Sequence, residues 1–312
     1  MKEKEDRGGC AIKTSVGGQA LMEGVMMRGP KRSAMAVRRP DQTIAVEEWN
    51  TKQSKGIRKL PFFRGIFSLI DSLSTGYKCL MRSAELSGEE EEPSKFEIWI
   101  EKKFGKSAET VFETAVTIVA VGVCLLLFMV IPSGIASLLQ QHIKSDFTLT
   151  LIEGVLKILI FFGYIAAISK MKEIRRTFMY HGAEHKTIAC YEAGEELTVE
   201  NIRKYTRLHP RCGTSFLILV LLISILVFSL VTWESLLVRV LLKLLLIPVV
   251  VGISYELIKY AGRHDNVLTR IISAPGLWLQ RMTTQEPDDS MIEVAIAAVT
   301  PVLPENRTED QW

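Results

Sequence analysis

Four apolar stretches constrain the fold of this chain more than any other feature of its sequence. They cover residues 112–131, 149–169, 214–232 and 236–258. Each has the roughly 17 to 25 residues that a helix needs to cross the hydrocarbon core of a bilayer. A single buried helix of a large soluble protein can look the same, but four in one chain predict an α-helical polytopic membrane protein with about four transmembrane helices.

The distribution of Lys and Arg predicts how these helices are oriented. Residues 1–110 contain 20 of these side chains, residues 170–213 contain 9 and residues 259–312 contain 5, whereas residues 132–148 contain only Lys144. Positive residues collect in cytoplasmic loops, so both termini and the middle loop are expected on the cytoplasmic side of the cell membrane. The predicted segments are a cytoplasmic region 1–110, a transmembrane hairpin 111–169, a cytoplasmic loop 170–213, a transmembrane hairpin 214–258 and a cytoplasmic region 259–312.

The composition argues against several classes of function. The formal net charge is only +3, which gives no electrostatic basis for nucleic-acid binding. The short outer connections leave little polar mass for an extracellular role, so the expected partners are the lipid bilayer and a cytosolic protein. The cysteines are odd in number and lack disulfide spacing, and we expect reduced thiols. They are Cys10, Cys79, Cys124, Cys190 and Cys212.

The cytoplasmic segments contain the patterns of a small mixed α/β cap. Residues 34–48 hold two short apolar runs on either side of Pro40, which predict a β-hairpin whose turn has Pro40 in its second position. An isolated hairpin is marginally stable in water, so another segment has to pack on it. The composition of residues 291–299 predicts a third strand there, so that the two ends of the chain meet in one sheet.

Residues 59–85 change to a period near 3.6 residues and predict an amphipathic helix. It does not qualify as a fifth span, because Arg64, Asp71 and Lys78 interrupt its apolar positions. Such a helix either lies at the membrane interface or packs under the sheet.

The sharpest chemical signal is His181-Gly-Ala-Glu184-His185, directly after the second span. In a helix, residues four apart share a face, so the two imidazoles are placed to share a metal ion, with zinc as the candidate. Glu184 then offers a carboxylate beside the ion, as in the inverted His-x-x-Glu-His motif of metalloproteases. The alternative is a helix cap or an interfacial histidine pair, since Gly182 weakens a helix.

A second group of candidate ligands precedes the third span, in His209-Pro-Arg-Cys212-Gly. Catalytic zinc sites usually have three protein ligands, so His181, His185 and one of His209 or Cys212 meet that count. The alternative for Cys212 is a small apolar filler at a helix start. Beyond the fourth span, His264 and Asp265 are candidates for outer positions of the site, where Asp265 would orient an imidazole.

Four segments of the chain resemble the bacterial YqhQ-like family. They are Gly17–Arg28 (Gly-Gly-Gln-Ala-Leu-Met-Glu-Gly-Val-Met-Met-Arg), His181–Lys186, His209–Thr214 and Pro275–Gln280 (Pro-Gly-Leu-Trp-Leu-Gln). The resemblance covers nearly the whole chain, and none of the four segments departs from the family's pattern. It implies a multi-pass membrane protein described as a metal-dependent enzyme, with no substrate or reaction assigned.

The glycine-rich segment that begins at Gly17 permits two interpretations. It lacks the Gly-Lys-Ser/Thr ending of a P-loop and the Gly-x-Gly-x-x-Gly fingerprint, so nucleotide binding is not expected. Its flexible backbone either covers the histidine cluster, with Gln19 or Glu23 pointing into it, or makes a tight turn that leads into the hairpin.

Charged residues inside the apolar stretches support a different class of function. Glu153 and Lys157 are one helical turn apart near the outer end of the second span, as Arg239 and Lys243 are near that of the fourth. Ion pairs such as Glu153 with Arg239 or Lys243 would join the two helices. Buried charges in a span are often functional and suggest a transporter or lipid-handling protein; the alternative is that the long side chains snorkel to the interface.

Two functions from different classes therefore remain, with a transporter as a third. The first is a metal-dependent hydrolase at the cytoplasmic membrane face, in which Glu184 is the general base. The second is a non-enzymatic scaffold or assembly factor whose cap binds a cytosolic protein, with a structural histidine cluster.

Overall fold

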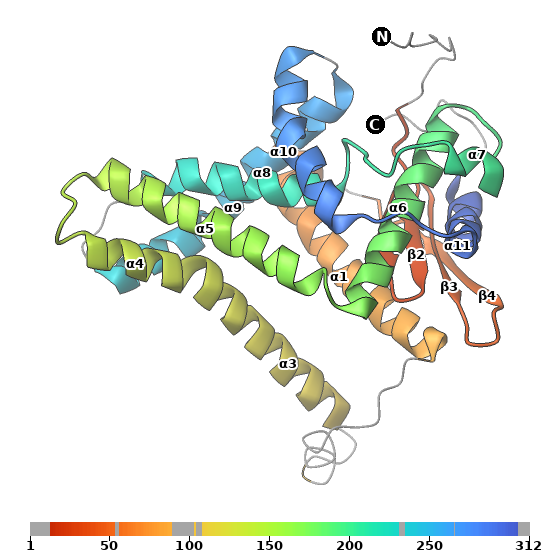
Figure 1. Ribbon diagram of the computed structural model, residues 1–312, viewed down its shortest axis with the longest axis horizontal. Helices are drawn as coiled ribbons and strands as arrows, with labels where there is room; N and C mark the ends of the chain where they lie inside the picture. Colours follow the sequence, from red (N-terminus) through yellow and green to blue (C-terminus); the bar gives the residue numbers. More distant parts are fainter. Residues whose placement is uncertain are drawn as a thin grey trace. The chain divides into compact units, whose positions relative to one another are not determined.

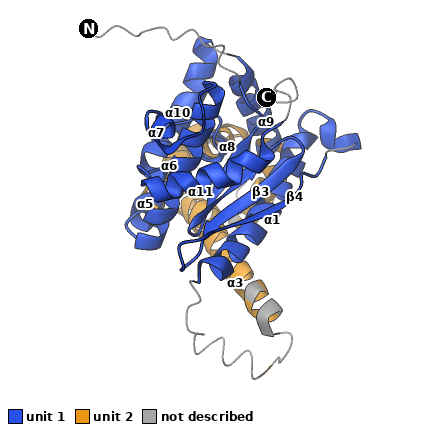
Figure 2. Cartoon of the chain, turned by 90° about the vertical axis from the view of Figure 1, so that its right-hand side faces the viewer, with its two compact units in different colours: residues 1–89, 165–220, 251–312 blue, residues 90–164, 221–250 orange. Residues whose placement is uncertain are grey.

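The chain divides into two compact units (Figure 2). Unit 1 comprises residues 1–89, 165–220 and 251–312, and unit 2 comprises residues 90–164 and 221–250. The computed structural model describes residues 13–53, 56–88, 103, 108–230, 235–264 and 266–304.

A four-stranded antiparallel sheet forms the centre of unit 1, with the strands in sequence order. The strands are β1 (Gly17–Leu21), β2 (Gly24–Arg28), β3 (Arg32–Arg38) and β4 (Ile44–Asn50). The glycine-rich segment thus supplies two antiparallel strands, β1 and β2, joined by a tight turn. Gly18 of β1 pairs with Met27 of β2. This agrees with the second interpretation of that segment, a turn that leads into the hairpin.

The two faces of the sheet carry different helices, because side chains alternate along each strand (Figure 1). On one face, Val25 and Met27 pack in a cluster that includes residues of α6 (Lys172–Glu192) and α11 (Asp289–Val299). On the other face, Met26 packs with residues of α1 (Phe63–Ser87). The mixed α/β cap that the sequence predicts is therefore a sheet between helices.

The predicted hairpin is confirmed. Strands β3 and β4 pair in register, with Ala36 opposite Val46. Their turn places Pro40 second, since the Gln42 amide donates to the Arg39 carbonyl at 2.9 Å. The left-handed backbone of Gln42, with φ of 69°, completes the reversal.

The strand predicted at 291–299 is wrong, because this segment is helical in α11. Asp288 caps the helix by accepting a hydrogen bond from the Met291 amide at 3.0 Å. The buried residues recur at a helical rather than an alternating period; they are Met291, Ile292, Val294, Ala295, Ala298 and Val299. The segment does pack on the hairpin, as expected, but it covers the sheet instead of extending it.

The amphipathic helix predicted at 59–85 corresponds to α1 and packs on the sheet, where Cys79 joins Leu21, Met26 and Met35. Several of its large apolar residues are nevertheless exposed. They include Phe63, Ile70, Leu73, Tyr77 and Met81.

Within the described part of the chain, three helical stretches are long and apolar enough to cross a membrane: Thr114–Leu139, Phe147–Ile168 and Leu237–Arg263. The first joins α3 (Ala108–Leu125), a π-helical turn (Leu126–Val130) and α4 (Ile131–Leu139); the others lie in α5 (Asp146–Ile168) and α9 (Leu236–Arg263). The third predicted stretch, 214–232, corresponds to the shorter α8 (Gly213–Phe228), which at 1.5 Å per residue is about 24 Å long.

The remaining elements are short or lie beside the site. They are the 3-10 turns η1 (Gly56–Lys59) and η4 (Thr300–Val302), and the helices α7 (Val199–Arg203) and α10 (Val267–Thr283).

Candidate metal centre

The histidine motif lies within the long helix α6, which confirms that it is helical. The glycine inside the motif has a packing role, since a Cβ at Gly182 would lie 2.0 Å from the carbonyl oxygen of Gln285. The chain after α10 runs along this helix, and the Gln285 amide donates to the Phe178 carbonyl at 2.8 Å. Gly182 therefore allows the segment that contacts His181 to approach the helix closely.

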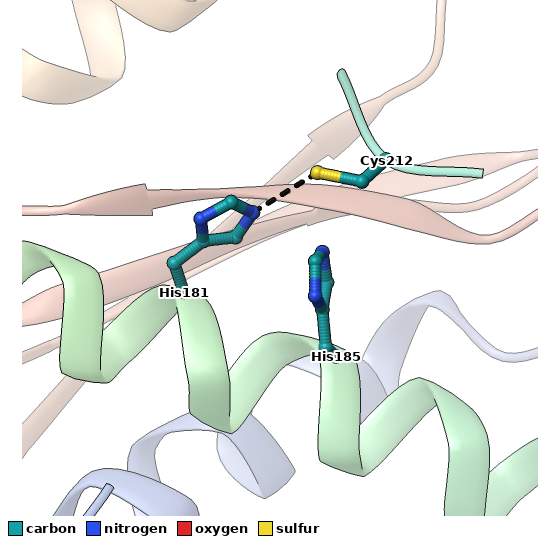
Figure 3. Close-up of side chains that lie close together, drawn as sticks. All are labelled: His181, His185 and Cys212. Carbon is teal, nitrogen blue, oxygen red and sulfur yellow. Dashed lines mark hydrogen bonds between the residues drawn. The ribbon is translucent and has the colours of Figure 1, made fainter. Parts of the chain in front are cut away.

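The structure brings His181, His185 and Cys212 together (Figure 3). One potential ligand atom from each residue lies within 4.8 Å of the others. His181 Nε2 is 3.1 Å from Cys212 Sγ, and the two imidazole centroids are 4.3 Å apart. Cys212, from the loop before α8, is thus the third member of the group.

Backbone carbonyls fix how both imidazoles are oriented. His181 Nδ1 lies 2.9 Å from the Thr283 oxygen and His185 Nδ1 lies 2.6 Å from the Arg207 oxygen. A carbonyl can only accept, so in each ring Nδ1 carries the hydrogen and Nε2 keeps a lone pair when the imidazole is neutral. This is the arrangement that outer hydrogen bonds give to histidine ligands of metals.

Two buried polar atoms beside these residues have no hydrogen-bond partner among the described residues. They are His185 Nε2 and Glu184 Oε2. Leaving a buried polar atom unpaired costs free energy, and a cation held by His181, His185 and Cys212 would satisfy His185 Nε2. Zinc prefers imidazole and thiolate donors, and one donor atom from each of the three residues lies within 4.8 Å of the others, so the donor set fits this metal.

The charges of the group favour a thiolate. Burial alone would raise the pKa of the Cys212 thiol, but the charges of His181 and His185 and the hydrogen bond with His181 outweigh it and hold the pKa well below its usual value. Burial lowers the pKa of His181, and the charge and hydrogen bond of Cys212 reverse this effect and raise it to about 9. The thiolate is the form of cysteine that binds metals or attacks electrophiles.

The Glu184 side chain is buried where helix α6 contacts strand β1. Burial raises the pKa of its carboxyl group, while the nearby imidazoles and a hydrogen bond from the Gly18 amide oppose that effect. A Cβ at Gly18 would lie 3.0 Å from the Glu184 carboxyl carbon, so a glycine is needed there. A carboxylate with a raised pKa suits proton transfer near neutral pH.

Gln280, a residue that the site prediction did not include, holds the loop that carries Cys212. Its Oε1 accepts from the His209 amide at 2.8 Å, and its Nε2 donates to the His209 carbonyl at 2.7 Å and to Ser215 Oγ at 3.0 Å. The side chain is fully buried. The available signal was its place at the end of the Pro275–Gln280 segment, which was among those carrying the family resemblance.

Glu192 holds the same loop from helix α6. It pairs with Arg211, lies 3.3 Å from His209 Nε2 and accepts from the Thr14 amide at 2.8 Å. Burial would raise its pKa, but the hydrogen bond with His209 and the charge of Arg211 lower it. Its position seven residues after His185, on the same helical face, was a signal for it in the sequence.

The other candidate site residues have different surroundings. The His209 ring lies near His185, with centroids 5.6 Å apart and the planes tilted by 42°, but its Nε2 faces Glu192 rather than the ligand group. The Gln19 side chain packs closely on Gly76 of α1, where an added Cβ would clash with it. Glu23 pairs with Arg176.

His264 also lies apart from the ligand group. Its ring stacks on Tyr260 with centroids 4.3 Å apart, and its Nδ1 lies 3.1 Å from the Tyr260 carbonyl oxygen. Asp265 lies outside the described residues.

The charged residues of unit 2 form a second buried cluster. Glu153 pairs with Lys157 at 2.9 Å and also with Lys243, and Ser133 donates to it at 2.9 Å. Arg239 is buried one turn before Lys243. The two lysines therefore bind the carboxylate within the unit.

Comparisons with known proteins agree on one family. A family model described as "Protein of unknown function (DUF1385)" matches residues 60–305. The "Uncharacterized protein YqhQ" of Bacillus subtilis (strain 168) is 35% identical over 299 residues, which is 94% of this chain and 93% of that protein. No solved structure matches the chain. As the sequence motifs predicted, the chain belongs to the DUF1385 family of YqhQ-like proteins.

Proposed function

We propose that this protein is a membrane-embedded, metal-dependent hydrolase. His181, His185 and Cys212 would hold a divalent cation such as zinc, and Glu184 would act as the general base. The polypeptide would cross the membrane four times, with both termini and the metal centre on the cytoplasmic side, as the positive residues suggest. Three sufficiently long apolar helices support the membrane part of this proposal.

The pair of unpartnered atoms at the cluster carries the proposal. His185 Nε2 and Glu184 Oε2 are both buried without a partner among the described residues. A structural histidine pair of the kind expected for a helix cap would be satisfied by protein groups. Here both Nδ1 atoms are satisfied by backbone carbonyls and His181 Nε2 lies 3.1 Å from the Cys212 thiol, but His185 Nε2 has no partner among the described residues, which supports a cation at this atom.

The residues would divide the work as follows. Two imidazoles and one thiolate make three protein ligands, the number that catalytic zinc sites use while one position stays open. A bound divalent cation would supply Lewis-acid chemistry, activating water and polarising an oxygen of the substrate. Glu184 Oε2 would take the proton from the attacking water, and the Gly18 amide would hold the other carboxylate oxygen in place.

One distance favours a second candidate, a cysteine hydrolase without metal. His181 Nε2 lies 3.1 Å from Cys212 Sγ, within reach for an imidazole that activates a thiol nucleophile. This mechanism gives no role to Glu184 Oε2 or to His185 Nε2, so we place it second. A scaffold that binds a cytosolic protein, or a transporter built on the charges of unit 2, has no comparable contact in its support.

Metal content tests the first step of the proposal. The measurement is mass spectrometry of metals on detergent-purified protein that has not met a chelator, for wild type and for His181→Ala/His185→Ala. We expect about one ion per chain in the wild type and none in the double variant. His264→Ala is the matched control, because that imidazole stacks on Tyr260 away from the ligand group and its loss should leave the ion bound.

The variant Glu184→Gln tests the hydrolytic step. It should retain the ion and the folded state, while failing to complement a deletion of the gene. Full complementation by Glu184→Gln would rule out the general base and favour a scaffold. Wild-type protein without metal, inactivated by alkylation of Cys212, would favour the cysteine hydrolase instead.

A further inference from the structure

Helix α10 has its hydrophobic side reversed relative to a helix of a soluble protein. Large apolar residues are exposed: Val267 is 73% exposed, Leu268 55%, Ile271 64% and Trp278 53%. The buried residues are mostly small or polar, namely Thr269, Gly276, Gln280 and Thr283, and Leu279 is the one large apolar residue among them. Amphipathic helices in water turn their apolar stripe to the core, so a different surrounding has to cover this face.

Val267, Ile271 and Trp278 form one stripe, and Leu268 lies at its edge, about 100° from Val267 around the helix. At about 100° per residue, Ile271 and Trp278 lie roughly 40° and 20° from Val267 around the helix, while the buried Gln280 lies on the opposite side. Contiguous exposed apolar surface of this kind marks an interaction surface. Basic residues with exposed positions, Arg270 and Arg281, flank the stripe.

The chain connects this helix directly to a candidate membrane span. The span Leu237–Arg263 ends four residues before Val267. Four residues reach at most about 14 Å, so the beginning of α10 lies within that distance of the end of the span. A capping box of Asn266 and Thr269 fixes the first turn of α10 at that place.

We propose that α10 lies in the bilayer interface, with its exposed apolar stripe in contact with lipid. The proposal rests on α9 crossing the membrane, as in the proposed function. An interfacial helix needs an apolar face, flanking basic residues and aromatic anchors at headgroup level. α10 supplies all three, with Trp278 as the anchor, and the covalent link to the span selects the bilayer over another protein as the occupant.

The opposite face of α10 belongs to the metal centre. Gln280 holds the His209 backbone, and the Thr283 carbonyl accepts from His181. One helix, about 10 Å across, therefore separates the lipid from the ligand group. The metal centre works at the membrane surface, where it meets substrates that are themselves bound to the bilayer.

Photo-crosslinking to lipid tests this placement. The full-length protein would carry a benzophenone amino acid at Ile271 and be reconstituted in nanodiscs of phosphatidylcholine and phosphatidylglycerol with a tagged lipid. Gln42, an exposed residue in the hairpin turn of the cap, is the matched control position. We expect at least tenfold more lipid adduct from residue 271 than from residue 42. Leu268 is the second position, should the variant at 271 not fold.

Three results would overturn the proposal: equal adduct yields at the two positions, no lipid adduct at 271 or 268, or an adduct with a second copy of the chain. Metal content, measured on the same samples, separates this proposal from the proposed function. Bound metal without lipid adducts would refute only the interfacial position of α10. Lipid adducts without metal would refute the metal centre and leave the interfacial helix in place.

Discussion

The substitution Gln280→Leu isolates the residue that positions Cys212 without touching any candidate ligand. Leucine has a similar volume and keeps the buried apolar environment, but it removes the amide. The His209 N–H and carbonyl groups would then lose their partner, and Ser215 would lose a donor. The expected result is a loop that no longer holds its thiol in place against the two imidazoles.

The structure gives the magnitude of this loss. Each buried backbone group left unpaired costs about 1 to 3 kcal/mol, and the leucine side chain recovers roughly 1 kcal/mol of this through its apolar surface. For the two His209 groups, the expected decrease in stability is therefore about 1 to 5 kcal/mol. Mutation of a residue that holds metal ligands in position typically lowers metal affinity by about 10- to 100-fold. We expect a loss of metal affinity in that range.

Competition with a chromophoric zinc chelator measures the affinity, and thermal unfolding in detergent measures the stability. Ser83→Ala is the matched control, because the Ser83 hydroxyl is fully buried and accepts from the Met22 amide at 3.2 Å, in a contact between α1 and the sheet. It should lower stability by about 1 kcal/mol and leave metal affinity unchanged. A folded Gln280→Leu protein that binds zinc as tightly as the wild type would refute the positioning role.

Two further predictions concern glycine and charge. Gly18→Ala places a Cβ 2.5 Å from a backbone carbonyl oxygen of the neighbouring strand and 3.0 Å from the carboxyl carbon of Glu184. This variant should therefore fail to complement a deletion of the gene. Gly17→Ala is the control and should complement fully, because an added Cβ there has no neighbour within 4 Å. Glu153→Gln leaves two buried lysines without their carboxylate and should lower stability by about 3 to 5 kcal/mol. The exposed Glu48→Gln should change stability by less than about 0.5 kcal/mol, and equal melting temperatures for these two variants would contradict the burial argument.

Local patterns predicted the elements whose partners are close in sequence. The hairpin followed from its turn, since Pro40 fixes its own backbone angle and needs no distant partner. The strand prediction for residues 291–299 was wrong because a short apolar run is compatible with a buried strand and with a buried helix. The cap at Asp288 favours the helix, and the contact with the sheet is available to either structure.

The sequence predicted the candidate ligands His181 and His185, but the choice of the third ligand depends on tertiary contacts. His181 and His185 share a face of α6 because of helical geometry alone. The choice between His209 and Cys212 depends on Glu192, which engages the imidazole and leaves the thiol facing His181. No spacing within the His209–Cys212 segment contains that information, because Glu192 lies on a different element.

The two amphipathic helices show why periodicity alone does not tell which side of a helix faces the protein. A 3.6-residue period identifies the stripe, but the stripe turns inward only when water covers the rest of the surface. In α1 the buried positions include Gly76, Cys79 and Ser83, while Leu73 and Tyr77 are exposed. α10 has the same reversal and leaves its polar face for the metal centre. Since the polar face of α10 stays inside to hold Gln280, its apolar face points outward, and the proposed contact with a bilayer would stabilise that orientation.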